Sequence, residues 1–211
     1  MPIRGDIKLE YEKMFFETGL YVPTREIYLG SHSFEDEYGE SGIDFMSSEF
    51  FIKSLKVLEA NSNEAITVYY NQIGGEWTHG IAIYDYIKAS PCHITIIGSG
   101  CVRSMGTIIM QSADERLLTL NTRWMIHDGF DGFGGIPKSF IATAEEAKLT
   151  LTQMYEIYYD ATKKWFDKQE YSEKRALKQI EQWCQADKYF SAEESVEMGF
   201  VDGIHKREDT E

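Results

Sequence analysis

Short apolar runs rich in β-branched and aromatic residues alternate with stretches of helical periodicity through the first two thirds of the chain. The strand-like runs cover residues 26–30, 66–70, 93–97, 117–120 and 124–126. Helical spacing of apolar residues lies before and between these runs, over residues 6–18, 48–61, 77–87 and 107–113. Strands that alternate with helices in this order predict parallel strands joined by helical crossovers, and therefore an α/β fold.

Several boundaries of these helices carry capping or helix-breaking residues. We expect Asp6 to begin the first helix and Gly19 to end it. Ser47 or Ser48 is expected to begin the second helix, because a serine hydroxyl can bond the free N–H groups of the first turn. Pro91 is expected to end the third helix.

The last third of the chain has a helical pattern. Thr143 and Glu146 have the spacing of a capping box, which predicts the start of a helix. Apolar residues then recur at steps of four and three, at Ala147, Leu151, Met154, Tyr158, Ala161 and Trp165. This seam fits packing against another helix, including one on a second subunit, whereas an ordinary core stripe is the simpler interpretation.

Further helices are predicted toward the end of the chain. The charged stretch 163–174 is interpreted as a break, after which Ser172 is expected to cap a second helix. Another capping box at residues 191–194 precedes a short helix that ends at Gly199. A last strand is expected at residues 200–201.

Composition narrows the classes of protein. The 211 residues, 43% of them hydrophobic, suffice for one domain with a well-filled core. The net charge of −14 argues against a nucleic-acid-binding face and against binding to an anionic membrane. Three cysteines without a Cys-x-x-Cys pair indicate reduced thiols, no zinc site and a cytoplasmic setting. No apolar run is long enough to span a bilayer. Residues 31–42 are acidic and polar, and they are expected to form a loop.

Ser104 is the first candidate for chemistry. It lies between the apolar run 93–97 and the helical stretch 107–113, at the end of a Gly-containing segment that is expected to be a loop. Free N–H groups and the positive end of a helix dipole at this position would stabilise an oxyanion. A plain helix N-cap is the alternative. Val102 breaks the G-x-S-x-G pattern, which argues against an α/β-hydrolase.

His127 and Asp187 complete a possible Ser-His-Asp set. His127 ends an apolar strand, and in open α/β sheets ligands gather at the ends of strands. Asp187 lies between two helices, and the following Tyr189 and Phe190 are expected to shield it from water. Such an Asp would orient a His ring and stabilise its cation, although a surface Asp is the alternative. The remaining histidines lack the spacing of metal ligands: His32, His79, His93 and His205.

These residues and their surroundings resemble the proteolytic subunit of the Clp protease, ClpP. The family has a Gly-Gly motif after a strand, a helix with Gly-x-x-Ile-Tyr-Asp, an Ala-Ser-Met-Gly nucleophile motif, a His motif and a Met-Ser-Ala-Glu-Glu stretch after its Asp. The corresponding stretches here are Asn71–Gly75, Gly80–Asp85, Arg103–Gly106, Asn121–His127 and Asp187–Asp202. The resemblance covers residues 65–130 and 184–204, with the motifs in the family's order.

The resemblance implies a fold and an assembly. The fold would be the ClpP/crotonase-like spiral of β-β-α units, forming a single domain over residues 1–211. Within it, residues 1–25 would be an N-terminal segment, residues 143–185 a protruding helical handle, and residues 206–211 a flexible tail. Two stacked heptameric rings of identical chains would enclose a chamber, and a Clp-type unfoldase ATPase would deliver unfolded protein to it.

The resemblance also implies roles for individual residues. Ser104, His127 and Asp187 would be the catalytic triad of a serine endopeptidase that acts on peptides or unfolded proteins. The backbone N–H groups of Gly75 and Met105 would form the oxyanion hole. Gly74, Glu76, Gly134 and Gly135 would contact the substrate. No cofactor and no metal ion would take part.

Departures from the family pattern concern substrate preference and partners. Gln72 and Ile73 replace a Ser and a Pro, and Asp128-Gly129 replaces the usual Gln-Pro after the His. Thr67 and Ala89 replace aromatic residues that the family uses to dock its ATPase. The alternatives that stay open are a non-catalytic ring subunit, a crotonase-type acyl-CoA enzyme and a binding scaffold.

Overall fold

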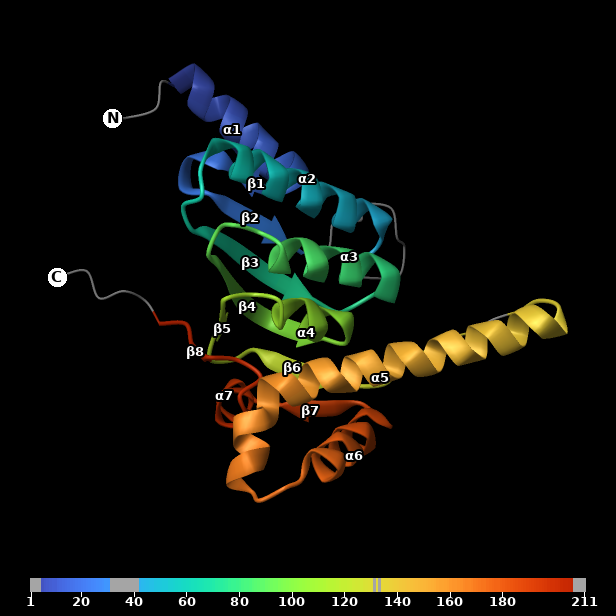
Figure 1. Ribbon diagram of the computed structural model, residues 1–211. Helices are drawn as coiled ribbons and strands as arrows, with labels where there is room; N and C mark the ends of the chain where they lie inside the picture. Colours follow the sequence, from blue (N-terminus) through green and yellow to red (C-terminus); the bar gives the residue numbers. More distant parts are fainter. Residues whose placement is uncertain (1–4, 31–41, 131, 133, 207–211) are drawn as a thin grey trace.

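One mostly parallel sheet forms the centre of the computed structural model, and helices α2, α3 and α4 lie together over one of its faces (Figure 1). The structure describes residues 5–30, 42–130, 132 and 134–206. The strands of this part are β1 (Leu20–Tyr21), β2 (Glu26–Leu29), β3 (Ile66–Gln72), β4 (Ile94–Arg103), β5 (Glu115–Leu118), β6 (Arg123–Ile126), β7 (Lys188–Phe190) and β8 (Gly203–Ile204). Its helices are α1 (Gly5–Thr18), α2 (Phe45–Asn61), α3 (Trp77–Lys88), α4 (Met105–Met110), α5 (Pro137–Lys168), α6 (Glu173–Cys184) and α7 (Ala192–Met198), with a 3-10 turn at Val22–Thr24.

The predicted parallel crossovers are confirmed. Strand β2 pairs in parallel with β3, and β3 with β4, while α2 and α3 connect them. The core-facing side chains of β3 and β4 are β-branched, and Ile66, Val68, Ile94 and Ile96 are each at most 1% exposed. The sheet order is β1-β2-β3-β4-β5-β8, and β6 joins it beside β4.

Strand β4 is longer than the sequence predicts, and the expected loop over residues 98–103 is wrong. The first half of β4 pairs with β5, whereas Cys101 to Arg103 pair with β6. The glycines that indicate a loop instead let the strand bend: Gly100 has a φ of +66°, and the register with β3 shifts between Tyr70 and Gln72. The strand therefore carries on to Arg103, directly before Ser104.

Some predicted helix boundaries are wrong. Helix α2 begins after Asp44, whose side chain accepts a hydrogen bond from the Ser47 N–H, so neither Ser47 nor Ser48 is the cap. Helix α5 begins at Pro137, with no capping box at residues 143–146, because a proline is suited to the first turn of a helix. The caps expected at Ser172 and at residues 191–194 are confirmed.

Three further expectations differ from the structure or lie outside it. Asp6 is inside α1, which already begins at Gly5. The last strand is β8 and not residues 200–201, because the Val201 N–H donates to the Ser195 carbonyl of α7. The loop expected at 31–42 lies outside the described residues except for Gly42, and so does most of the tail.

Helix α5 is long, and its N-terminal half extends away from the rest of the molecule (Figure 1). Its C-terminal half belongs to the core: Met154 is 6% exposed and Tyr158 0%. For these two residues the seam is a core stripe within the chain and not a contact between subunits. Large apolar side chains are exposed on the protruding half at Phe140, Ile141 and Leu149, and directly before the helix at Ile136.

Aromatic rings join α5 and α6 to strands β6 and β7. Phe166 of α5 stacks on Trp183 of α6 with ring centroids 5.6 Å apart. Trp183 meets Phe190 of β7, and Trp124 of β6 reaches the same cluster through Phe200. Because these large rings are mostly buried, the cluster fixes the two strands from which His127 and Asp187 project.

Candidate active site

Ser104 occupies the sharp connection between β4 and α4. Its backbone has φ +51° and ψ −128°, a conformation that non-glycine residues rarely adopt. The Ser104 N–H donates to the Met125 carbonyl at 2.8 Å, and the Ser104 carbonyl accepts from the N–H and the hydroxyl of Thr107. Ser104 makes no side-chain capping bond with α4, so its hydroxyl is available to other partners.

His127 and Asp187 face each other at the ends of two antiparallel strands. Ile126 of β6 pairs with Lys188 of β7, so the next position of the ladder brings His127 opposite Asp187. The His127 Nδ1 lies 2.9 Å from Asp187 Oδ1, and its Nε2 lies 2.8 Å from the Ser104 Oγ. The three residues that the sequence singles out are therefore joined in one hydrogen-bonded row.

The order of donors and acceptors in this row suits transfer of a proton from Ser104 to His127. An ionised Asp187 only accepts hydrogen bonds, which favours the tautomer of His127 with the proton on Nδ1. The Nε2 is then free to accept the proton of the Ser104 hydroxyl. An arrangement of this kind raises the nucleophilicity of a serine.

The predicted shielding of Asp187 is wrong for the single chain. The Asp187 side chain is 57% exposed, against 26% for His127. Side chains alternate along β7, so Phe190 points into the core and Tyr189, 40% exposed, lies beside the guanidinium of Arg103.

Gly74 and Gly75 bring the backbone close to Ser104. A Cβ atom on Gly74, whose φ is +109°, would lie 2.6 Å from the Ser104 Cβ and 3.2 Å from its Oγ, so no larger residue fits without a shift. Gly75 forms an isolated parallel bridge with Ile43: the Ile43 N–H donates to the Gly74 carbonyl, and the Glu76 N–H donates to the Ile43 carbonyl. The Gly74 carbonyl and the Gly75 N–H belong to one trans peptide group, in which the C=O and N–H point in opposite directions, so the Gly75 N–H points away from Ile43.

The other predicted site residues lie at the ends of secondary-structure elements. Met105 is the first residue of α4, where backbone N–H groups lack partners within the helix. Glu76 is exposed and precedes α3. Gly134 and Gly135 are exposed just before α5, and a Cβ on Gly134 would meet no described atom within 4 Å.

Comparison with known proteins gives the family. The family model for Clp protease matches residues 39–208 of this chain. The chain belongs to the Clp protease family. It is 33% identical over 171 residues to the ATP-dependent Clp protease proteolytic subunit 2 of Tropheryma whipplei, a match that covers 79% of this chain and 87% of that protein. It is 30% identical over 165 residues to proteolytic subunit 1 of Leifsonia xyli, covering 77% and 78% of the two chains.

A solved structure confirms the fold. A mutant ClpP1 from Listeria monocytogenes superposes with a TM-score of 0.72 at 25% identity, covering 89% of this chain and 95% of that one. The α/β fold of this chain is therefore the ClpP/crotonase-like fold that the resemblance implied. The identity near 30% also agrees with a divergent member of the Clp protease family.

Some residues that shape this site cannot be identified from patterns in the sequence. Ile43 is a single apolar residue after a polar stretch, so no local pattern indicates that it pairs with Gly75. Thr107 contacts the Ser104 carbonyl and also the Tyr158 hydroxyl, at 2.6 Å. This second contact joins α4 to α5 across 51 residues, a distance in sequence at which periodicity carries no information.

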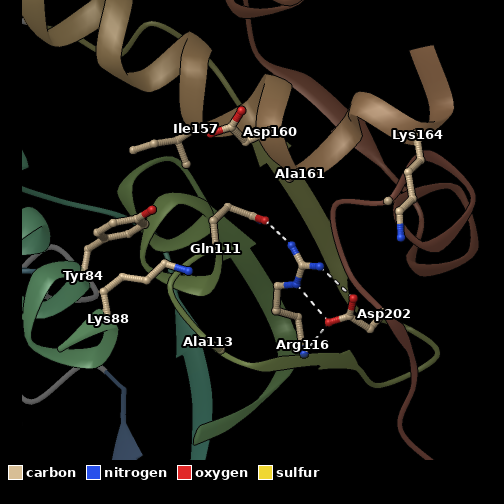
Figure 2. Close-up of a pocket in the computed structure, with 11 residues that line it drawn as sticks. Tyr84, Lys88, Gln111, Ala113, Arg116, Ile157, Asp160, Ala161, Lys164 and Asp202 are labelled. Carbon is tan, nitrogen blue, oxygen red and sulfur yellow. Dashed lines mark hydrogen bonds and ion pairs between the residues drawn. The ribbon is translucent and has the colours of Figure 1, made fainter. Parts of the chain in front are cut away.

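A cavity of about 510 Å³ lies at the opposite end of α4 from Ser104 (Figure 2). Tyr84 and Lys88 of α3 line one side, and Asp160 and Lys164 of α5 line another. Its lining includes neither Ser104 nor His127 nor Asp187. The cavity is therefore separate from the hydrogen-bonded row.

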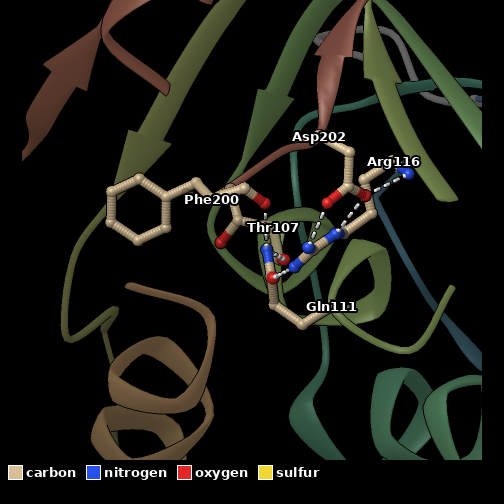
Figure 3. A network of polar contacts seen from close by, with 5 residues as sticks. All are labelled: Thr107, Gln111, Arg116, Phe200 and Asp202. Carbon is tan, nitrogen blue, oxygen red and sulfur yellow. Dashed lines mark hydrogen bonds and ion pairs between the residues drawn. The ribbon is translucent and has the colours of Figure 1, made fainter. Parts of the chain in front are cut away.

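A polar network at the edge of this cavity anchors α4 (Figure 3). The guanidinium of Arg116 donates to Asp202 at 2.6 and 2.9 Å and to the Gln111 side-chain oxygen at 2.6 Å. The Gln111 amide donates in turn to the Phe200 carbonyl at 3.1 Å. The network holds the C-terminal end of α4 against β5 and the turn before β8.

The described residues contain neither a membrane-spanning helix nor a cluster of metal-binding side chains. No helix there combines the length and the apolar character needed to cross a membrane. No group of three or more His, Cys, Asp or Glu side chains in the same part of the chain is arranged to hold a metal ion. The cytoplasmic location expected from the sequence stays a prediction.

Proposed function

We propose that this chain is a serine endopeptidase that cleaves short peptides or unfolded polypeptides with the triad Ser104, His127 and Asp187. The observation that carries the proposal is the row of two hydrogen bonds, 2.8 Å from Ser104 to His127 and 2.9 Å from His127 to Asp187. The strained backbone of Ser104 supports it, because such strain persists at functional sites. Membership of the Clp protease family supports it as well.

The reaction follows from the geometry. The Ser104 Oγ attacks the carbonyl carbon of the scissile peptide while the His127 Nε2 takes its proton. Asp187 holds the Nδ1–H and stabilises the imidazolium. His127 then gives the proton to the leaving amine, and a water molecule activated by the same Nε2 hydrolyses the acyl-serine.

The oxyanion hole is assigned to the N–H groups of Gly75 and Met105. The Gly75 N–H is not used in the bridge to Ile43, and the Met105 N–H, at the start of α4, has no acceptor within that helix. Each donor of this kind typically contributes a 10²–10³-fold rate effect. Gly74 and Glu76 are proposed to contact an extended substrate beside these donors. Gly134 and Gly135 stay a prediction as further substrate contacts, because they precede the half of α5 that extends away from the rest of the molecule.

We also propose that the chain assembles into two stacked heptameric rings around a closed chamber. Helices α5 and α6 would form the handle between the rings, slightly longer than the 143–185 expected from the sequence. The exposed apolar side chains of the protruding half of α5 support this, because a patch of this kind in water favours association.

An unfoldase ATPase of the Clp type is the proposed partner. The surface of this chain on which the ATPase would dock is expected to carry fewer aromatic side chains than in the family. Tyr69 is 37% exposed, and its partner in the parallel ladder is Tyr28, which is 38% exposed. Thr67 and Ala89 supply no aromatic ring. Tyr70 is fully buried and adds nothing to such a surface. Docking of a standard Clp ATPase is therefore expected to be weak.

A serine-directed fluorophosphonate separates this proposal from the alternatives. A peptidase with an activated Ser104 reacts covalently with the probe. A non-catalytic ring subunit, a binding scaffold or a crotonase-type enzyme, which needs no activated serine, would not be labelled at Ser104. Peptide hydrolysis measured on the same sample shows whether the labelled serine acts on amides.

A further inference from the structure

The residue after His127 is held by two helices. The Asp128 N–H donates to the carbonyl of Cys184, the last residue of α6, at 2.7 Å. The Asp128 carboxylate accepts a hydrogen bond from the Tyr155 hydroxyl of α5, also at 2.7 Å. The Tyr155 ring packs against the hydrophobic core. The chain that leaves β6 is thus tied to both α5 and α6 within one residue of His127.

Packing ends directly after Asp128. Gly129 has a φ of +82°, and a Cβ placed on it would meet no described atom within 4 Å. Phe130 is 98% exposed. Among the described residues that follow β6, Asp128 is therefore the last one anchored before Gly129 and Phe130. Strand β6 holds His127 from one side through the pair of Ile126 with Lys188, and the two contacts of Asp128 hold it from the other.

The Tyr155 hydroxyl remains a donor at any working pH. Burial raises the pKa of Tyr155 far above its usual range, and the hydrogen bond to Asp128 and the nearby Cys184 and Glu181 raise it further. Burial also raises the pKa of the Cys184 thiol, and Asp128 adds to this effect, so the thiol stays protonated. In the contact of Tyr155 with Asp128, the hydroxyl is therefore the donor and the carboxyl oxygen the acceptor.

We infer that Tyr155 and Asp128 form a positioning pair, which keeps the His127 ring in line with both Ser104 and Asp187. The inference rests on the proposed function for its effect on catalysis. Neither residue touches the reacting atoms. The pair acts by restraining the backbone on which the His127 ring is mounted, and a displacement of about 1 Å at such a ring is enough to cost up to 10²-fold in rate.

Four variants test the pair. Tyr155→Phe removes only the hydroxyl and keeps the packed ring, and Asp128→Ala removes the acceptor. Asp128→Asn keeps an oxygen that accepts from Tyr155 and serves as the conservative rescue. Tyr159→Phe is the matched control, since the Tyr159 hydroxyl on the same helix contacts Lys163 and not the His127 strand.

The inference predicts a split between kcat and KM on a short fluorogenic peptide. Tyr155→Phe and Asp128→Ala lower kcat about ten- to hundredfold with KM within about twofold, whereas Asp128→Asn and Tyr159→Phe stay near wild type. The kcat of the double variant Tyr155→Phe/Asp128→Ala is no lower than that of either single variant, because each substitution removes the same hydrogen bond. A kcat for Tyr155→Phe within twofold of wild type, or a change confined to KM, overturns the inference.

Amide hydrogen exchange tests the positioning pair independently of activity. Tyr155→Phe is expected to speed exchange across residues 126–130, and Tyr159→Phe is not. A wild-type chain that neither reacts with fluorophosphonate nor cleaves peptides would contradict the proposed function alone. In that case, unchanged exchange in Tyr155→Phe overturns the pair, and faster exchange supports it.

Discussion

Gly74 lies directly against Ser104: a Cβ atom placed on Gly74 would stand 2.6 Å from the Ser104 Cβ. Real Cβ atoms do not approach so closely, and the φ of +109° at Gly74 is itself unfavourable for any other residue. The glycine therefore lets the chain before α3 pass immediately beside the nucleophile. This close approach links the Gly-Gly motif to the position of the Ser104 hydroxyl.

Gly74→Ala is expected to lower both activity and stability. The new methyl group would push Ser104 away from His127, with a loss of roughly ten- to hundredfold in kcat/KM. The strained backbone would cost about 1–3 kcal/mol of unfolding free energy. Gly203→Ala is the control, because a Cβ there meets only the Leu117 side chain, at 3.4 Å. Equal activity of Gly74→Ala and wild type would show that Gly74 does not restrict Ser104.

Much of the fold is predictable because local chemistry determines it. Strand β3 and the first part of β4 are rich in β-branched and aromatic residues, and β2 and β3 alternate buried with more exposed side chains, a pattern that can be recognised from the sequence alone. The caps at Ser172 and Ser191 are equally local. The triad could be named because its three short motifs resemble those of one family in the same order.

The remaining features depend on long-range contacts. Gly98 and Gly100 suggest a loop, and only pairing with β3 and β6 makes their segment a strand. The bridge from Ile43 to Gly75 and the contact of Tyr155 with Asp128 join residues 27 or more positions apart. Neither hydrophobic periodicity nor spacing can indicate such pairs.

Assembly is expected to depend on the protruding half of α5. Leu149 is 65% exposed, so Leu149→Asp should leave the folded chain intact while placing an unpaired charge in the proposed interface. Light scattering at micromolar concentration should then show a smaller particle. Gln153→Asp, which adds the same charge at an exposed polar position of the helix, is the control.

Met154→Asp separates folding from assembly. Met154 is 6% exposed within its own chain, so this substitution should lower the melting temperature rather than only divide the particle. A monomeric mass for the wild-type chain would contradict the proposed rings.

Asp202 should stabilise the protein in a pH-dependent way. Burial raises the pKa of Asp202, but the hydrogen bonds and charge of Arg116 outweigh burial and leave it below its ordinary value of 3.8. A lowered pKa stabilises the fold above the unfolded value, and this contribution disappears as the pH falls through the folded value. The contribution is thus complete above about pH 5.

Asp202→Asn should therefore lower the unfolding free energy by about 1–2 kcal/mol at pH 7, a value kept small because solvent screens the partly exposed carboxylate. Urea denaturation at pH 7 and at pH 3 measures this, and the difference from wild type should shrink at the lower pH. Asp167→Asn, which removes an exposed i,i+4 ion pair, should change little at either pH. A constant difference at both pH values would rule out this assignment.

The central claim is that Ser104 is an activated nucleophile, and covalent labelling tests it most directly. Wild-type chain incubated with a fluorophosphonate should gain one adduct, which peptide mass spectrometry places on Ser104. Ser104→Ala should lose the adduct together with peptide hydrolysis, and His127→Ala should lower both by ~10⁴ or more. Ser99→Ala, which removes the hydroxyl of a serine within β4, should behave as wild type. Labelling that persists in Ser104→Ala, or a wild-type chain that takes up no probe, would contradict the account.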